Sequence, residues 1–371
     1  MSSENYQGYE TGPIRPPSEA ASLLLRLTRN CPWNNCTFCT LYKGEKFSLR
    51  PKEHILQDID WLKILIDGFR GIKSEKPLNC PPSEWLYWAA GNWFENGLES
   101  VFLQDANSLL YRPSDLIEIL KYLRNLFPEI RRVTSYARSH TVARIDDNDL
   151  IEMSKAGLNR IHIGLESGSD RILKLVKKGV DKQTHILAGR KLKNAGIELS
   201  EYYMPGLGGK VYWQENALET ADALNRINPD FIRIRTLTVL PHSPLAEDYR
   251  KGVFIRMNDV EIVEELLLFM ENLSGIDSKV RSDHILNLLP EVEGKLPEDK
   301  QKIIDVMNWF LELNEEEQMI YRLGRRSLTM HCRDDLYNSQ KRRRVENLIA
   351  RNGITTENID VWIERLMNRF V

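Results

Sequence analysis

The stretch that decides the fold runs from Arg132 to Ile163, RVTSYARSHTVARIDDNDLIEMSKAGLNRIHI. Its two ends, 132–136 and 160–163, are short apolar-rich runs typical of buried strands, and 147–155 between them has the periodicity of an amphipathic helix. A strand, a helix and a second strand in this order predict two parallel strands of one sheet, joined by a right-handed crossover.

The same pattern repeats on both sides of this stretch. We expect further strands at 22–28, 101–103, 198–204 and 231–235, and helices at 52–70, 83–96, 115–127, 171–176, 184–194 and 214–227. Six strands separated by helices predict an α/β protein with a parallel sheet. Periodicity alone leaves open whether this sheet is open and doubly wound or forms a partial barrel.

The chain divides into three expected parts. Residues 1–20 are polar and contain several prolines, which predicts a flexible arm. Residues 21–255 carry the strand–helix alternation and form the expected core. Residues 256–371, with helical periodicity at 260–273 and 300–313, are expected to form a mainly helical C-terminal extension.

Composition excludes several classes of protein. The 371 residues include 51 Lys and Arg against 53 Asp and Glu, a net charge of −2, with 28% charged and 42% hydrophobic residues. These values are ordinary for a folded soluble protein and argue against a surface built entirely to bind nucleic acid. No run approaches the roughly 18 apolar residues of a membrane span, and the N-terminus has no apolar signal core, so we expect a cytoplasmic protein. Its five cysteines are then expected to be reduced thiols, metal ligands or catalytic groups.

Three cysteines, Cys31, Cys36 and Cys39, lie in one loop after the first expected strand, with the spacing C-x4-C-x2-C. Thiolates at this spacing can surround one metal centre. A structural zinc site needs a fourth ligand, for which Cys80 and His54 are the nearest candidates, whereas an iron–sulfur cluster held by three thiolates keeps one iron open. The residues alone leave both metals open. Cys80 and Cys332 are expected to be free thiols.

This loop resembles that of the radical S-adenosylmethionine (SAM) superfamily, although the usual spacing there is C-x3-C-x2-C. The resemblance implies a partial (β/α)6 barrel of parallel strands, with the three cysteines holding a [4Fe–4S] cluster whose fourth iron binds SAM. In that family an electron from the cluster cleaves SAM to methionine and an oxygen-sensitive 5′-deoxyadenosyl radical. The resemblance also implies that Phe38, just before the third cysteine, packs beside the adenine.

A second stretch supports this resemblance. Residues 160–170, RIHIGLESGSD, are similar to the fourth strand and following turn of the subgroup with oxygen-independent coproporphyrinogen dehydrogenases and tRNA methylthiotransferases. Lys178 follows Glu166 by twelve positions, as a basic residue does in that subgroup. The resemblance implies that Lys178 holds the SAM carboxylate and that Glu166 binds ribose hydroxyls or the amino group. A solvated loop acid is the alternative for Glu166.

The remaining cofactor contacts implied by the resemblance lie at the ends of other strands. They are Gln104, Asp105 and Ala106 near the methionine amino group, Ser135 and Arg138 near the ribose or the carboxylate, and Leu207 in an adenine-side turn. The two glycines that the family has beside the acid are absent here. A turn-initiating Asp105 and an ordinary surface Arg138 are the alternatives.

Candidate substrate residues lie on the sixth strand and beyond. Arg233 and Arg235 are two apart and so share one face of a strand. We expect this face to point inward, where two cations need an anionic partner such as a substrate or SAM carboxylate. A solvent-exposed edge strand is the alternative. His284 is a candidate substrate donor, with a structural histidine as the alternative.

We therefore expect a radical SAM enzyme acting on an unidentified anionic small molecule, with an electron donor such as flavodoxin or ferredoxin. A tRNA-modifying enzyme is the first alternative, because residues 322–344 contain eight Lys and Arg against two acids. A solvated helical surface is the simpler explanation of these charges, and we rank nucleic acid below a small molecule as the partner. A non-enzymatic zinc-binding interaction protein is the alternative of another class. No membrane partner is expected.

Overall fold

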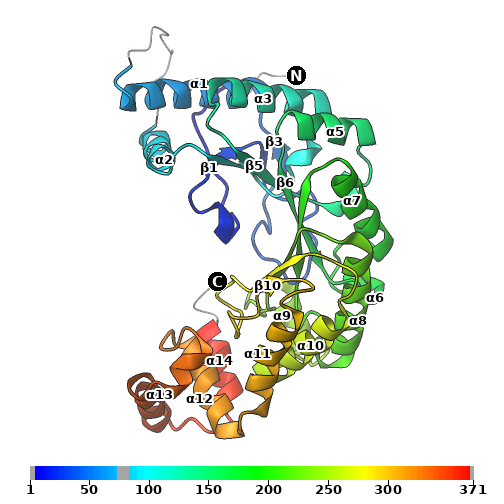
Figure 1. The fold of residues 1–371 in the computed structure, drawn as a ribbon, viewed down its shortest axis with the longest axis vertical. Helices are drawn as coiled ribbons and strands as arrows, with labels where there is room; N and C mark the ends of the chain where they lie inside the picture. The colour runs from blue at the N-terminus through cyan, green and yellow to red at the C-terminus, as the bar shows by residue number, and fades with distance from the viewer. Residues whose placement is uncertain (1–4, 73–82, 368–371) are drawn as a thin grey trace. The chain divides into compact units, whose positions relative to one another are not determined.

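A computed structural model of the protein describes residues 5–72 and 83–367, so Cys80 lies outside the described residues. The chain forms two compact units (Figure 1). The first unit comprises residues 1–34, 42–163 and 187–199, and the second comprises residues 35–41, 164–186 and 200–371. Two strands, β6 (Arg160–Glu166) and β7 (Glu198–Tyr203), pass from the first unit into the second along the chain.

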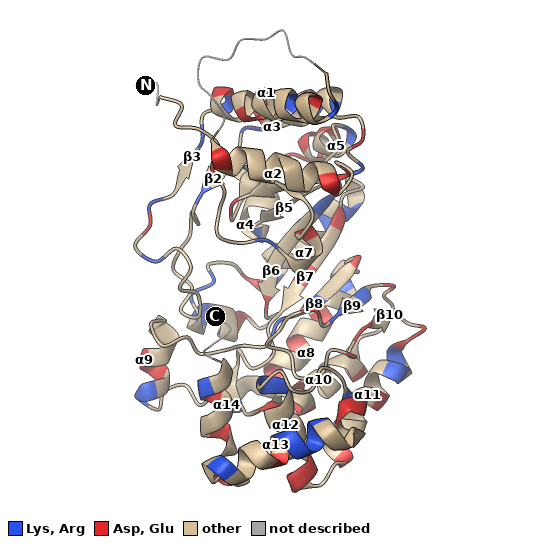
Figure 2. Ribbon diagram, turned by 90° about the vertical axis from the view of Figure 1, so that its left-hand side faces the viewer, with Lys and Arg blue, Asp and Glu red and all other residues tan. Residues whose placement is uncertain are grey.

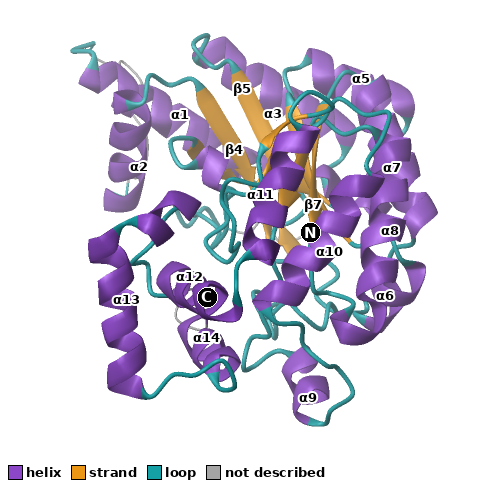
Figure 3. Ribbon diagram, turned by 60° about the horizontal axis from the view of Figure 1, so that its bottom comes forward, coloured by secondary structure: helices purple, strands orange, loops and turns teal. Residues whose placement is uncertain are grey.

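Parallel strands form the centre of the first unit. They pair in the order β1 (Leu23–Arg26), β4 (Ser100–Gln104), β5 (Arg132–Ala137) and the start of β6. Four helices of this unit connect or flank them, namely α1 (Lys52–Phe69), α2 (Glu84–Glu95), α3 (Pro113–Leu126) and α5 (Asp147–Lys155), with α1 packed against both α2 and α3 (Figure 3). The expected run 101–103 is fully buried in β4. Minor elements are η1 (Pro17–Glu19), β2 (Thr28–Arg29), β3 (Ser48–Leu49), η2 (Ser108–Leu110) and α4 (Ser139–Val142).

The segment before β1 lies along the first unit. Glu10 accepts hydrogen bonds from Arg29 and forms ion pairs with Arg26 and Arg50, at 3.2 and 2.8 Å. The Tyr9 ring is buried, and its hydroxyl donates to the carbonyl of Leu24. These contacts attach the segment to the unit, which its composition does not predict.

The strands of the second unit are the end of β6, then β7, β8 (Phe231–Ile234), β9 (Lys279–Arg281) and β10 (Gly294–Lys295). β7, β8 and β9 are parallel, and β10 is antiparallel to β9. Its helices are α6 (Asp170–Leu175), α8 (Gly209–Ile227), α9 (Pro244–Arg250), α10 (Asp259–Asn272), α11 (Lys300–Glu312), α12 (Glu315–Arg326), η3 (Arg333–Tyr337), α13 (Ser339–Asn352) and α14 (Ile359–Met367). Helix α7 (Lys182–Asn194) begins in this unit and ends in the first.

The predicted α/β class with parallel strands is confirmed, and the region after residue 255 is mainly helical. β9 and β10 add two strands that the sequence analysis did not predict, because runs of three and two residues are too short to show a period of two. The boundaries of the arm, core and extension, 1–20, 21–255 and 256–371, stay a prediction. In the described part of the chain, no helix combines the length and apolar character that crossing a membrane requires.

Buried ion pairs join two of the C-terminal helices, α10 and α12. At the start of α10, Asp259 receives Arg326 at 2.6 Å and Arg322 at 3.3 Å, both from α12. Burial alone would raise the pKa of the Asp259 carboxyl, but the two guanidinium groups outweigh it and lower this pKa to about 2. The expectation that residues 322–344 form a solvated or RNA-facing surface is therefore wrong for Arg322 and Arg326, which are 5% and 2% exposed.

Candidate functional site

The cysteine loop leads from one unit to the other. Cys31 belongs to the first unit, whereas Cys36 and Cys39 belong to the second. Within the longer first spacer, Asn34 has a left-handed φ of 49°, and its side-chain amide donates a hydrogen bond to the carbonyl of Tyr42. Asparagine tolerates this backbone conformation better than most residues, so it suits a C-x4-C spacer that must turn tightly.

The thiols of the loop have the chemistry that an iron–sulfur cluster requires. Cys31, Cys36 and Cys39 are half-buried and form no disulfide within the described residues, and Cys332 is a free thiol as expected. Within residues 5–72 and 83–367, no three or more His, Cys, Asp or Glu side chains are already gathered around one metal position. The fit of the loop to a cluster therefore rests on its three soft donors.

Three of the predicted cofactor residues lie together in the second unit. Glu166, at the end of β6, accepts a hydrogen bond of 2.9 Å from the ammonium of Lys178, and both side chains are largely buried. The same ammonium lies 6.0 Å from the centroid of the Phe38 ring. A Cβ atom at Gly164 would lie 2.1 Å from the Glu166 carboxylate, so only glycine leaves room for this pair. The structure therefore assembles Phe38, Glu166 and Lys178 into one group.

Glu201 belongs to this group, although the sequence analysis passed over it. It lies on β7, is fully buried, and neither carboxyl oxygen has a hydrogen-bond partner among the described residues. Burial raises the pKa of Glu201 well above its usual value, while the charge of Lys178 lowers it and that of Glu166 raises it. The buried Glu201 carboxyl therefore favours its protonated form, in which it has an O–H to donate. An acid in the middle of a strand expected to be buried was the available signal.

The glycine-rich turn after β7 contributes Leu207 to an apolar cluster near these charged residues. Leu207 is buried in a cluster with Ile172, Met204 and Leu237, and Phe38 packs against the same cluster. Phe38 and Leu207, both predicted on the adenine side, thus share one apolar surface. Such a surface suits the flat face of a base and keeps water out.

Glu265 of α10 stabilises this turn through hydrogen bonds. Its carboxylate accepts hydrogen bonds from the backbone N–H of Gly206 at 2.9 Å, the Tyr203 hydroxyl at 2.6 Å and the Asn216 amide at 2.7 Å. Complete burial raises the pKa of Glu265 to about 7, although these three donors act in the opposite direction. Glu265 was not predicted, because its role depends on a helix almost sixty residues away in sequence.

In the first unit, the predicted residues Gln104 and Asp105 are engaged by the chain itself. Asp105 is fully buried, pairs with Arg26 at 3.0 Å and accepts a hydrogen bond from the Tyr42 hydroxyl. Burial raises the pKa of Asp105, against the influence of these two partners. The Gln104 side chain binds both the N–H and the carbonyl of Gly12. These bonds favour a structural role for both residues.

The other predicted residues of the first unit differ in how far the chain itself uses their side chains. The Ser135 hydroxyl donates to the carbonyl of Leu103 at 2.9 Å and is buried. Ala106 and Arg138 are half-buried, and the Arg138 guanidinium lies 5.0 Å from the centroid of the Trp33 ring, inside the cysteine loop. Arg138 therefore places a positive charge beside the cysteine loop.

The two arginines of the sixth expected strand have different surroundings. Arg233 on β8 is 4% exposed, forms an ion pair with Asp283, and donates to the Ser200 hydroxyl at 3.2 Å. Arg235 is exposed, and its guanidinium makes no hydrogen bond or ion pair within the described residues. β8 ends at Ile234, so the alternation that places both on one face does not extend to Arg235.

His284 lies near Arg235. Its Nδ1 accepts a hydrogen bond from the N–H of Leu286 at 3.3 Å. Burial and then the charge of Arg235 lower the pKa of His284 to about 4, against the influence of Asp283. The imidazole is therefore neutral at pH 7 and carries its proton on Nε2. Arg235, directly after β8, thus provides an exposed cation, and His284, after β9, provides a neutral hydrogen-bond donor near it.

The family model "Radical SAM superfamily" matches residues 25–221, which is more than half of the chain. The chain belongs to the radical SAM superfamily. Its members are enzymes, so this radical SAM protein is an enzyme, and the predicted cofactors, a [4Fe–4S] cluster and SAM, are confirmed. The alternative of a non-enzymatic zinc protein is set aside by this assignment.

Relatives of this radical SAM protein include enzymes named for tRNA. The tRNA uridine(34) acetyltransferase of Methanocaldococcus infernus is 27% identical over 119 residues, covering 32% of this chain and 22% of the relative. The tRNA-2-methylthio-N(6)-dimethylallyladenosine synthase of Christiangramia forsetii is 28% identical over 185 residues, covering 48% and 34%. The chain thus spans a fifth to a third of these relatives. Coproporphyrinogen III oxidase of Escherichia coli has a TM-score of 0.47 at 16% identity, covering 67% of this chain and 52% of that structure.

If Lys178 holds the SAM carboxylate as predicted, replacing it by Ala weakens SAM binding by about 1.5–3 kcal/mol, the contribution of one charge-assisted hydrogen bond. Titration calorimetry on anaerobically purified protein measures this, and the iron content should not change. Lys174→Ala, an exposed lysine one turn earlier, is the matched control. Unchanged SAM affinity in the Lys178 variant would contradict the assignment.

Glu265 gives the stability of the turn a pH dependence. Because its pKa is about 7 in the folded protein and about 4.5 when unfolded, its contribution is complete below pH 4.5 and is lost as pH rises through 7. The stability difference between the natural protein and a Glu265→Gln variant should therefore be larger at pH 5 than at pH 8, by roughly 3 kcal/mol. Urea unfolding at both pH values measures it. A difference that is independent of pH would show that Glu265 does not titrate in this range.

Proposed function

We propose that this enzyme acts on an anionic substrate bound at the carboxyl end of β8, with Arg235 as the anion-binding residue. The observation that carries the proposal is the exposed, unpaired guanidinium of Arg235 directly after a parallel strand. Ligands of parallel α/β sheets bind outside the carboxyl ends of the strands. β8 neighbours β7, which carries Glu201 of the charged group around Lys178.

The residues proposed to hold the cofactors follow from the site. Cys31, Cys36 and Cys39 are the proposed cluster ligands, Lys178 the partner of the SAM carboxylate, and Glu166 the acceptor for ribose hydroxyls or the amino group. When bound, the cluster and SAM supply reductive cleavage of SAM and a 5′-deoxyadenosyl radical that takes hydrogen from the substrate. In its protonated form, which burial favours, Glu201 can donate its O–H to a ligand oxygen.

The chain's own groups give the substrate site its chemistry. The planar guanidinium of Arg235 suits two parallel hydrogen bonds to a carboxylate or phosphate. The neutral His284 can add a third from Nε2. The ion pair between Arg233 and Asp283 neutralises the buried cation on β8, so that Arg235 is the cation left for a ligand.

A modified nucleotide in RNA is the second candidate substrate. Two named relatives are tRNA enzymes, although the chain covers only 22% and 34% of them. A nucleotide phosphate would satisfy Arg235 as well as a free carboxylate does. We further propose a cytoplasmic location and a flavodoxin or ferredoxin as the electron donor.

Cys36→Ala is expected to abolish the brown colour and the iron content of the anaerobically purified protein, because three thiolates are needed to hold the cluster. Iron analysis and EPR spectroscopy measure this. Cys332→Ala removes a free thiol outside the loop and is the control that should keep full iron content. Equal losses in both variants would show that the proposed ligand set is wrong.

Arg235→Met is expected to keep the cleavage of SAM that occurs without substrate, and to lose anion binding. With inorganic phosphate as the probe, binding should weaken about 10–100-fold, the effect of removing a charge-assisted bond. The NMR signal of the His284 imidazole follows the titration. Arg351→Met, which changes another exposed arginine, should bind phosphate normally. Phosphate affinity equal to that of the natural protein in the Arg235→Met variant would refute the role of Arg235.

A further inference from the structure

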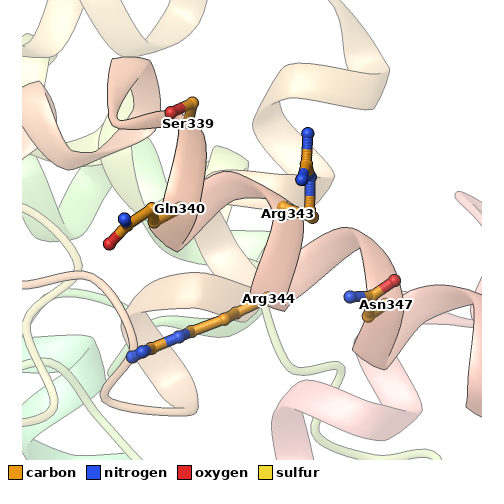
Figure 4. A pocket seen from close by; sticks show the side chains of 5 residues that line it. All are labelled: Ser339, Gln340, Arg343, Arg344 and Asn347. Atoms are coloured by element: carbon orange, nitrogen blue, oxygen red, sulfur yellow. The ribbon is translucent and has the colours of Figure 1, made fainter.

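Helix α13 presents a strongly basic face to solvent. Val345 is buried on the inner side, whereas Arg343 and Arg344 are exposed (Figure 4). Figure 2 shows basic residues gathered along α13. Because the residues three and four apart on a helix share a side, Gln340, Arg343, Arg344 and Asn347 form one continuous stripe.

Most of the basic residues in 322–344 are neutralised within the second unit. Besides Arg322 and Arg326, Arg325 donates to backbone carbonyls of Leu288 and Met330. Lys341 pairs with Asp335 at 2.7 Å, and Arg342 pairs with Glu346 at 2.9 Å.

Arg343 and Arg344 differ from these neighbours. Neither guanidinium has a carboxylate or carbonyl partner within the described residues. The two side chains extend in different directions from the helix (Figure 4), so each guanidinium is separately accessible to an anionic ligand.

The stripe lines a depression of about 380 Å³. Its lining consists of Ser339, Gln340, Arg343, Arg344 and Asn347, so it offers two guanidinium groups, two amides and a hydroxyl, and none of these five is an acid or an apolar side chain (Figure 4). Guanidinium forks and side-chain amides are the groups that bind phosphate oxygens and sugar hydroxyls. A membrane surface would require apolar side chains beside the cations.

An aromatic ring lies just before this stripe. Tyr337, the last residue of η3, is 63% exposed, and its hydroxyl accepts a hydrogen bond of 2.9 Å from the indole N–H of Trp309. This bond orients the ring while leaving it accessible. Exposed aromatic rings beside arginines are typical of proteins that stack unpaired bases.

We propose that the face of α13 formed by Gln340, Arg343, Arg344 and Asn347, together with Tyr337, binds single-stranded RNA. The arginines contact two phosphates, the amides contact the backbone, and Tyr337 stacks on a base. This RNA-binding surface would hold the RNA substrate of the second candidate function, and the proposal rests on that function. Its test measures RNA binding, whereas the proposed reaction is tested by SAM cleavage, so the two fail separately.

The experiment measures binding of the full-length, cluster-containing protein to a fluorescent oligouridine and to unfractionated tRNA at several KCl concentrations. The double variant Arg343→Ala/Arg344→Ala should reduce the slope of log K against log salt by about 1.4, and affinity roughly 25-fold at 0.1 M salt, since each single-strand phosphate contact contributes about 0.7 to the slope. Tyr337→Ala should weaken binding to oligouridine more than to an RNA duplex.

A matched control removes two positive charges elsewhere. Lys174→Ala/Lys302→Ala changes exposed lysines outside α13 and should leave the slope unchanged. Equal losses in both double variants would reduce the effect to net charge and overturn the proposal. Full RNA affinity in the arginine variant would also overturn it, as would equal binding of polyglutamate, which would identify an acidic protein as the partner.

Discussion

The ion pair between Lys178 and Glu166 is the interaction on which the candidate site depends. The ammonium of Lys178 pairs with Glu166 and also lowers the pKa of Glu201. One cation thus interacts with two largely buried acids. Burial penalises charge strongly, and it raises the pKa of Glu201 well above its usual value. SAM, with its carboxylate, ammonium and sulfonium groups, would bring one more anion and two more cations to this group. The absence of a side chain at Gly164 is what lets the Glu166 carboxylate lie there at all.

A second constraint is the support of the glycine-rich turn. Glu265 accepts three hydrogen bonds and thereby joins β7, the turn and α8 to α10. Leu207 of the turn is buried in an apolar cluster, and Phe38 packs against the same cluster. A reactive radical requires a site that excludes water, and packed apolar walls with satisfied polar groups behind them provide one. The helical extension is thus part of how the core site is built, because α10 supplies Glu265.

Polar residues within and directly after the strands divide into two kinds in this protein. In the first unit, Gln104, Asp105 and Ser135 use their hydrogen-bonding capacity on the chain itself. In the second unit, Glu201 and Arg235 leave theirs unused within the described residues. Unused capacity in a buried group such as Glu201 costs free energy unless a ligand satisfies it. Cofactor and substrate binding are therefore proposed beside β7 and at the ends of β6 and β8.

The sequence by itself determined the alternation of strands and helices, the cysteine loop, and the spacing that joins Glu166 to Lys178. These are local patterns, and local periodicity and spacing survive in a linear reading. Only the tertiary structure decided which charges are available. It buried Arg322 and Arg326 against Asp259, paired Arg233 but not Arg235, and enclosed Glu201 and Glu265. The physical reason is that burial and pairing arise from partners distant in the chain, and these set whether a side chain serves the fold or remains free for a ligand.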